Sequence, residues 1–331
     1  DLYPVHPDDS SHLTTSKMNT YHSTKPSKRK VFAVRFAATL LMFLFGILLG
    51  LNSKAQSSQT QESNFYAITG NGLKDTSWLF GTYHLVKSSY LAEVPAVVRA
   101  FEKAKAVAVE LELDSAEMAA ASTLGLLKDK TLSELLDQPF KDSLDKELKT
   151  TLGVGIDRFN QLKPMNVALT LSMVYLVTDP KSPLQKYTGA MLDGYFAAAG
   201  KEAGKTITAF ETLEEQMNLL FNKSTVEEQV HMLKQFLRNK QEMISEGNEL
   251  IEAWFQHHLS AMYAATEKGM QVFGNEDELL KKRNDRWMQI IPGLLKKESQ
   301  FIAVGALHLA GPQGLVQQLQ RAGYTLTPIK L

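Results

Sequence analysis

The chain has 331 residues, 44% of them hydrophobic and 22% charged, with a formal net charge of zero at pH 7. This is the composition of a globular protein long enough for an α/β domain, and because no basic block lies outside the N-terminal region, no nucleic-acid-binding surface is expected. The chain has no cysteine, which excludes disulfides, thiolate metal sites and cysteine nucleophiles.

The N-terminal region has the order of a signal peptide. A basic cluster between Lys25 and Arg35 precedes the uncharged apolar stretch 36–51, and small residues follow at 53–55. We therefore predict that residues 1–55 are an N-terminal extension and signal peptide, and that the protein is exported to the periplasm or the cell surface. The alternative is an uncleaved segment that associates with the membrane. The polar residues 56–64 are predicted to be a disordered lead-in.

The remaining chain alternates strand and helix patterns. "FYAITG" and "WLFGTYH" flank an Asn-Gly turn and predict a β-hairpin over 65–84. Further strands are predicted at 106–113 and 205–211, in the run that leads to His308, and at 324–331. The patterns predict helices at 91–104, 115–177, 188–200, 213–269, 276–297 and 312–322.

This alternation predicts an α/β fold for residues 65–331, with a mixed or mostly parallel sheet flanked by helices. The long helical stretches predict an added helical cap, formed by an insert at about 213–275.

Two strand ends carry the same motif. Gly81 precedes His84, and Gly305 precedes His308, by the same spacing. A glycine at such a place fits backbone that must bend or closely approach a ligand. In α/β sheets, ligands bind in the crevice beyond the carboxyl ends of the strands.

The strand "AVAVELEL" carries acids on one face. Alternation places Ala108, Glu110 and Glu112 together. In a central strand these carboxylates are buried and need a cation or hydrogen bonds. In an edge strand with one wet face they are ordinary surface acids, and the sequence leaves this alternative open.

Together the three strand ends predict a metal centre. His84, His308 and one of the two glutamates Glu110 and Glu112 form a common protein ligand set for a catalytic divalent ion. The chain has neither a His-Glu-x-x-His helix nor a Gly-x-Ser-x-Gly elbow, which argues against a zincin or a serine hydrolase.

Several stretches of the chain, taken together and in order, resemble the TraB/GumN family, which includes the Tiki proteases. They are "FYAITGNG", "SWLFGTYHL", "AVAVELEL", "MLDGYF", "AGKTITAFETLEEQ", "RNDRW" and "FIAVGALHLAGPQGLVQQLQRAGYTLTPI". The resemblance covers about residues 65–331. It implies a fold like that of erythromycin esterase and the ChaN-type proteins and, for the Tiki branch, a protease that depends on a divalent metal, with manganese or cobalt favoured and zinc or iron possible.

The resemblance also assigns residues. It implies His84, Glu110 and His308 as the metal ligands. Glu112 or Glu211 is then expected to be the general base, and the neighbours Arg283 and Asn284 to hold a substrate carboxylate or the oxyanion. Glu112 stands where Tiki-like sequences usually carry aspartate. The oligomeric state is not predicted.

The expected function is therefore an exported metal-dependent hydrolase that acts on a peptide or protein substrate. Two alternatives are kept. One is a protein that binds a peptide or another small ligand without turnover; the resemblance to the TraB branch, which is linked to shutting down peptide pheromone signalling, fits such sequestration as well as it fits cleavage. The other is a metal-free hydrolase, like an esterase, in which a motif histidine is the base.

Overall fold

The computed structural model describes residues 62–112, 115–265 and 277–331. The predicted signal peptide, the apolar stretch 36–51 and most of the predicted lead-in lie outside the described residues, as do the last residues of the predicted insert. Within the described ranges, no helix combines the length and the apolar character needed to cross a membrane.

The core of the molecule is a six-stranded sheet, in the spatial order β4-β3-β5-β2-β1-β6. Strands β4, β3, β5 and β2 run parallel to one another, and β1 pairs antiparallel with both β2 and β6. The strands are β1 (Phe65–Gly70), β2 (Ser77–Thr82), β3 (Ala106–Leu111), β4 (Thr206–Glu211), β5 (Gln300–Gly305) and β6 (Tyr324–Pro328). The predicted α/β fold with a mixed, mostly parallel sheet is confirmed, whereas the likeness to erythromycin esterase stays a prediction.

The β1–β2 pair is the predicted hairpin. Its turn holds Gly70, Asn71 and Gly72 at φ values of 80°, 47° and 76°. Glycine adopts this left-handed region without a steric penalty, and asparagine tolerates it better than most residues, which explains why this short sequence reverses the chain.

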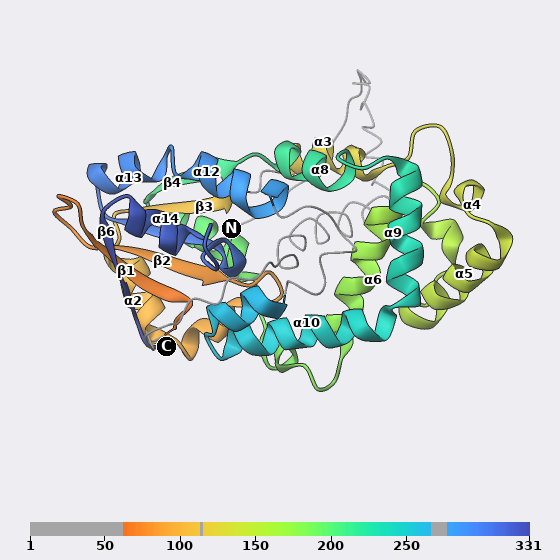
Figure 1. Cartoon of the computed structure of the whole chain (residues 1–331), viewed down its shortest axis with the longest axis horizontal. Helices are drawn as coiled ribbons and strands as arrows, with labels where there is room; N and C mark the ends of the chain where they lie inside the picture. Colours follow the sequence, from red (N-terminus) through yellow and green to blue (C-terminus); the bar gives the residue numbers. More distant parts are fainter. Residues whose placement is uncertain (1–61, 113–114, 266–276) are drawn as a thin grey trace, which may run out of the picture.

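Helices cover both faces of the sheet (Figure 1). On one face, the ring of Phe301 in β5 lies 5.5 Å from Phe101 of α2 (Pro95–Lys103) and 4.8 Å from Phe196 of α7 (Leu192–Glu202). On the other face, Phe210 of β4 stacks on Trp287 of α12 (Lys282–Trp287). Helices α13 (Ile291–Lys297) and α14 (Leu315–Arg321) follow α12 in the chain.

Strand β3 is therefore a central strand. It pairs with β4 on one side and β5 on the other, and its residues are buried up to Glu110. This settles the alternative that the sequence left open: Glu110 is a buried carboxylate that needs compensating partners.

A helical region packs at one end of the sheet and has an apolar core of its own, which includes Leu144, Leu171, Leu233 and Phe236 (Figure 1). Helix α6 lies at its centre, in contact with α5, α9 and α10, and is apolar around almost its whole circumference. The helices of this region are α3 (Ser115–Ala121), α4 (Leu132–Leu135), α5 (Gln138–Leu152), α6 (Pro164–Thr178), α8 (Leu213–Phe221), α9 (Val226–Arg238) and α10 (Lys240–Phe255). Helices α8 to α10 lie within the stretch 213–275, and α3 to α6 lie within 115–178. That 213–275 is an insert stays a prediction.

Short helical turns connect these elements. They are η1 (Ser88–Ala92), η2 (Ser122–Gly125), η3 (Ile156–Arg158), η4 (Pro183–Lys186), η5 (Asp277–Lys281) and η6 (Ala306–His308).

Candidate functional site

The carboxyl ends of the four parallel strands lie at one edge of the sheet and bring the predicted site residues together. Glu110 lies near the end of β3 and Glu211 ends β4, while His84 follows β2 and His308 ends the turn η6 directly after β5. A Cβ atom placed on Gly305 would lie 3.0 Å from Glu110 Oε1, 3.8 Å from His308 Cδ2 and 3.9 Å from His84 Nε2. The two motif histidines and the buried glutamate of β3 therefore surround one point.

The two motif glycines allow close packing within the protein. A Cβ on Gly81 would lie 2.9 Å from both Cα and Cβ of Ala306, so the backbones of the two motifs are in direct contact. The N–H group of Gly305 donates to Glu110 Oε1 at 2.5 Å. The close approach predicted for these glycines is thus made to the neighbouring motif and to a carboxylate.

The centre of the site is the guanidinium of Arg283, which α12 places among the strand ends. Nε donates to both carboxylate oxygens of Glu211, at 2.7 and 2.9 Å, and Nη2 donates to Glu211 at 2.6 Å and to Glu110 Oε2 at 3.0 Å. Nη1 donates to the carbonyl of Leu279 at 3.1 Å and to His308 Nε2 at 2.6 Å. All five N–H groups of Arg283 therefore have acceptors inside the protein.

Several hydrogen bonds of the site also converge on Glu211. Besides Arg283, it accepts from Arg286 Nη2 at 2.9 Å, from Trp287 Nε1 at 3.1 Å and from Gln216 Nε2 at 3.3 Å. Burial favours the neutral carboxyl, but the charge and hydrogen bonds of Arg283 outweigh this and hold the pKa of Glu211 below its usual value. Glu211 is thus a charged partner of Arg283.

The neighbour of Arg283, Asn284, fixes the tautomer of His308. Because guanidinium groups only donate, His308 Nε2 must accept from Arg283, and its proton lies on Nδ1. Nδ1 then donates to Asn284 Oδ1 at 2.7 Å, while Asn284 Nδ2 donates to the carbonyls of His308 and Gln313. Burial and the charge of Arg283 hold the pKa of His308 well below its usual value. His308 is a neutral imidazole.

His84 has a different partner, Asp193 of α7. His84 Nδ1 lies 2.5 Å from Asp193 Oδ2, and the hydroxyl of Thr82 donates to the other oxygen of the same carboxylate. Burial opposes a charge on His84, but Asp193, and then Glu110, outweigh it and raise the pKa of His84 above its usual value. The sequence analysis missed Asp193, although it lies within the "MLDGYF" stretch; an acid in the first turn of a helix that follows a loop was the available signal.

Glu110 is influenced by the charges of both Arg283 and His84. Burial raises the pKa of Glu110, and the positive charge of Arg283, followed by that of His84 and the Gly305 N–H, offsets only part of this shift. Glu110 therefore holds a proton more readily than Glu211 does, although both contact the same guanidinium.

Glu112, predicted as a possible general base, lies apart from this cluster. Strand β3 ends at Leu111, so the alternation that would put Glu112 on the face of Glu110 no longer applies. Its half-buried carboxylate pairs with Lys201 of α7. Glu112 and Glu211 line one side cavity of about 360 Å³, together with Glu117 and Glu215. The roles predicted for Glu112 and Glu211 stay predictions.

The metal ion predicted for His84, Glu110 and His308 does not fit this arrangement. The one lone pair of His308 Nε2 accepts from Arg283, and the oxygens of Glu110 accept from Arg283 and from Gly305. A permanent cation is thus already bound to two of the three expected ligands. In the described parts of the chain, no three His, Asp or Glu side chains are arranged to hold a metal ion. The metal stays a prediction that requires Arg283 to move.

Comparisons with known proteins identify the family. The model of the TraB/PrgY/gumN family matches residues 64–328, which is most of the chain, and the chain therefore belongs to this family. No curated protein and no solved structure matches the chain.

Proposed function

We propose that this chain, as a member of the TraB/PrgY/gumN family, is an exported hydrolase that acts on peptides and uses His84 as its general base. The observation that carries the proposal is the contact between His84 Nδ1 and Asp193 Oδ2 at the strand ends, next to a carboxyl group and a buried cation. An imidazole oriented by a carboxylate is the arrangement that activates water or a hydroxyl group in many hydrolases.

The contact with Asp193 defines what each nitrogen of His84 does. With its proton on Nδ1, donated to Asp193, the imidazole presents the lone pair of Nε2 toward the side of Gly305 and Glu110. Nε2 takes a proton from a water molecule as the water oxygen attacks the carbonyl carbon. The imidazolium formed is stabilised by Asp193, and its proton then passes to the leaving amine.

The other residues set the electrostatics of the step. Arg283 acts through its charge, because its five N–H groups are all engaged; for it to bind substrate directly, as predicted from the resemblance, one of these bonds would have to be exchanged. Asn284 and His308 hold this guanidinium in place. Glu110, whose pKa is raised by burial, lies with His84 Nε2 around the point marked by Gly305.

Binding without turnover is the second candidate, and one observation favours it. Glu211, Arg283 and His308 are almost completely buried, whereas the Asp193 side chain retains 22% of its exposure. His84 Nε2, the proposed base atom, is itself buried, so a ligand that reaches only the exposed part of Asp193 would be bound rather than cleaved.

The test is hydrolysis of a fluorogenic peptide library by the purified protein before and after treatment with chelator, with elemental analysis of both samples. His84→Ala should lower the rate by about 100-fold or more, and Asp193→Asn should lower it less. His231→Ala, in the exposed part of α9, is the matched control and should change nothing.

The outcomes separate the candidates. Hydrolysis that survives chelation and is lost in His84→Ala supports the proposal. Hydrolysis that requires a bound metal, itself lost in His84→Ala and His308→Ala, supports the metal-dependent enzyme instead. Saturable peptide binding without turnover supports the second candidate, and full activity in His84→Ala overturns the role given to this histidine.

A further inference from the structure

The residue that follows the C-cap of helix α10 is of an unusual type for its position. The N–H of His258 donates to the carbonyl of Ala253, and the N–H of His257 donates to the carbonyl of Trp254, each at 3.0 Å. This pair of bonds is the Schellman motif, in which the residue after the C-cap takes a left-handed conformation. Glycine usually occupies that position, and here it is His257, with φ of 60°.

The left-handed conformation of His257 stands out in the molecule. In the described ranges, only one other non-glycine residue has a positive φ, and it is Asn71 in the hairpin turn. A side chain with a Cβ atom is strained in this region, whereas glycine is not. Such local strain is found preferentially where a side chain has a functional role.

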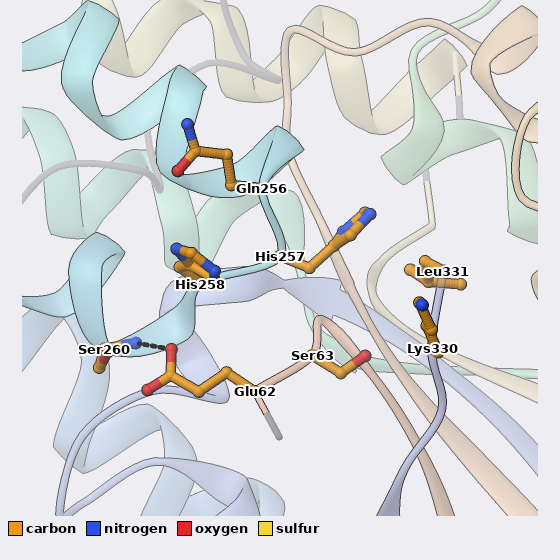
Figure 2. Close-up of a pocket in the computed structure, with 8 residues that line it drawn as sticks. All are labelled: Glu62, Ser63, Gln256, His257, His258, Ser260, Lys330 and Leu331. Atoms are coloured by element: carbon orange, nitrogen blue, oxygen red, sulfur yellow. Dashed lines mark hydrogen bonds between the residues drawn. The ribbon is translucent and has the colours of Figure 1, made fainter. Parts of the chain in front are cut away.

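The side chain of His257 lines a cavity of about 580 Å³. Figure 2 shows its ring on the same side of the backbone as Lys330 and Leu331, while the ring of His258 lies on the other side. His257 Nδ1 is buried and has no hydrogen-bond partner among the described residues. A buried polar atom without a partner is costly in a folded protein, so a ligand atom at this point would relieve it.

Two charged side chains set the electrostatic character of the cavity. Lys330 forms no ion pair with any of the residues that the structure describes. Glu62, on the other side of the cavity, accepts a hydrogen bond from the backbone N–H of Ser260 at 3.1 Å. Lys330 thus offers a positive charge to a ligand, but Glu62 disfavours a ligand with more than one negative charge.

The cavity adjoins the strand that carries the first Gly-x-x-His motif. Trp254, at the end of α10, donates from its indole to the carbonyl of Gly81 at 3.0 Å. Asn64, next to the cavity residue Ser63, donates to the carbonyl of Trp254 at 2.8 Å. Trp254 therefore connects the segment that carries Ser63 to β2.

We propose that this cavity is a binding site for a small monocarboxylate, in which Lys330 supplies the charge and His257 donates from Nδ1–H to a carboxylate oxygen. The neutral imidazole provides one directional donor, and the lysine, which lines the same cavity, provides a cation. A neutral donor with a single net charge suits a carboxylate better than a phosphate dianion. The site is independent of the hydrolysis proposed for His84.

The experiment is a titration of the full chain with acetate and with N-acetylglycine, observed through the ring signals of labelled histidines by NMR at constant ionic strength. The signals of His257 should shift saturably, with a millimolar Kd. Lys330→Met and His257→Gly should each weaken binding by about fivefold or more. Lys296→Met removes an exposed lysine from α13 and should have no effect.

Thermal unfolding of His257→Gly gives a second, independent readout. Because glycine removes the strain at this φ, the variant should have a higher Tm than the parent while it binds acetate more weakly. Retention of the wild-type Kd in Lys330→Met, absence of a saturable shift, or phosphate binding as tight as acetate binding would overturn the proposal. A lower Tm in His257→Gly would refute the argument from strain.

Discussion

The two Gly-x-x-His motifs share one spacing and end in histidines with opposite properties. His84 is held by the carboxylate of Asp193, and its pKa is raised; His308 is held by a guanidinium and an amide, and its pKa is well below the usual value. The backbone brings both to the same place, so the difference arises from the helices that cover them. Helix α7 supplies an acid to one, and α12 supplies a cation to the other.

This difference indicates that the two histidines have different roles. The histidine with a raised pKa and a partly accessible partner is suited to proton transfer. The buried neutral histidine orients Arg283 and so balances two carboxylates. A motif that looks symmetric in sequence is therefore asymmetric in chemistry.

Replacing Arg283 is expected to cause the largest loss of stability, because this residue holds His308 but not His84. Arg283→Met leaves Glu211 buried without its main cation, and we expect a loss of about 3–5 kcal/mol in the free energy of unfolding, measured by urea denaturation. Arg286→Met is the control, since this arginine contacts the same carboxylate but its side chain is 57% exposed; it should cost less than about 1 kcal/mol. Equal losses in the two variants would contradict the central place given to Arg283.

The glycines of the two motifs should also differ. Gly81→Ala forces a Cβ against the backbone of Ala306, which cannot move independently, and should cost about 1–3 kcal/mol of unfolding free energy. In Gly305→Ala the one tight contact is with the end of the Glu110 side chain, and the two histidine rings lie at ordinary contact distances, so we expect a smaller loss of stability. Because it displaces Glu110, it should still abolish the proposed hydrolysis. The idea fails if Gly305→Ala proves the less stable variant.

The substitution Asp193→Asn is expected to have the smallest effect. It should change how the free energy of unfolding depends on pH. The pKa of His84 is raised in the folded state, so its stabilising contribution is fully present below the unfolded pKa of about 6.5 and is lost as the pH rises through the folded pKa. The wild type should therefore exceed Asp193→Asn by about 1 kcal/mol at pH 5.5, and by less at higher pH. Urea denaturation across this range measures the difference, and a gap that widens with pH would contradict it.

The sequence was sufficient to predict the sheet and the convergence of its ends. Apolar runs flanked by turn residues located the hairpin and the buried strands, and the rule for parallel strands placed His84, Glu110 and His308 together. These features depend on local patterns and on topology alone.

The partners of these residues were not predictable in the same way. Whether a cation near Glu110 is a metal ion or a guanidinium depends on how α12 packs, because a long side chain such as Arg283 reaches its acceptors from a distant segment. The contact of Asp193 with His84 likewise depends on α7 covering the sheet. Glu112 illustrates a different limit: its predicted face assumed that β3 continues, whereas the strand ends at Leu111.

The order of the strands has a consequence for how the protein forms during synthesis. Strand β5 lies between β2 and β3 in the sheet but comes after the entire helical region in the chain. A nascent chain that ends at Lys297 has the hairpin and the β3–β4 pair but lacks both β5 and β6, so the edges of β2 and β3 that later pair with β5 are open, as is the edge of β1 that later pairs with β6. Such unpaired edges are prone to aggregation. Chaperones that shield exposed strand edges are therefore expected to associate with this protein until β5 is made.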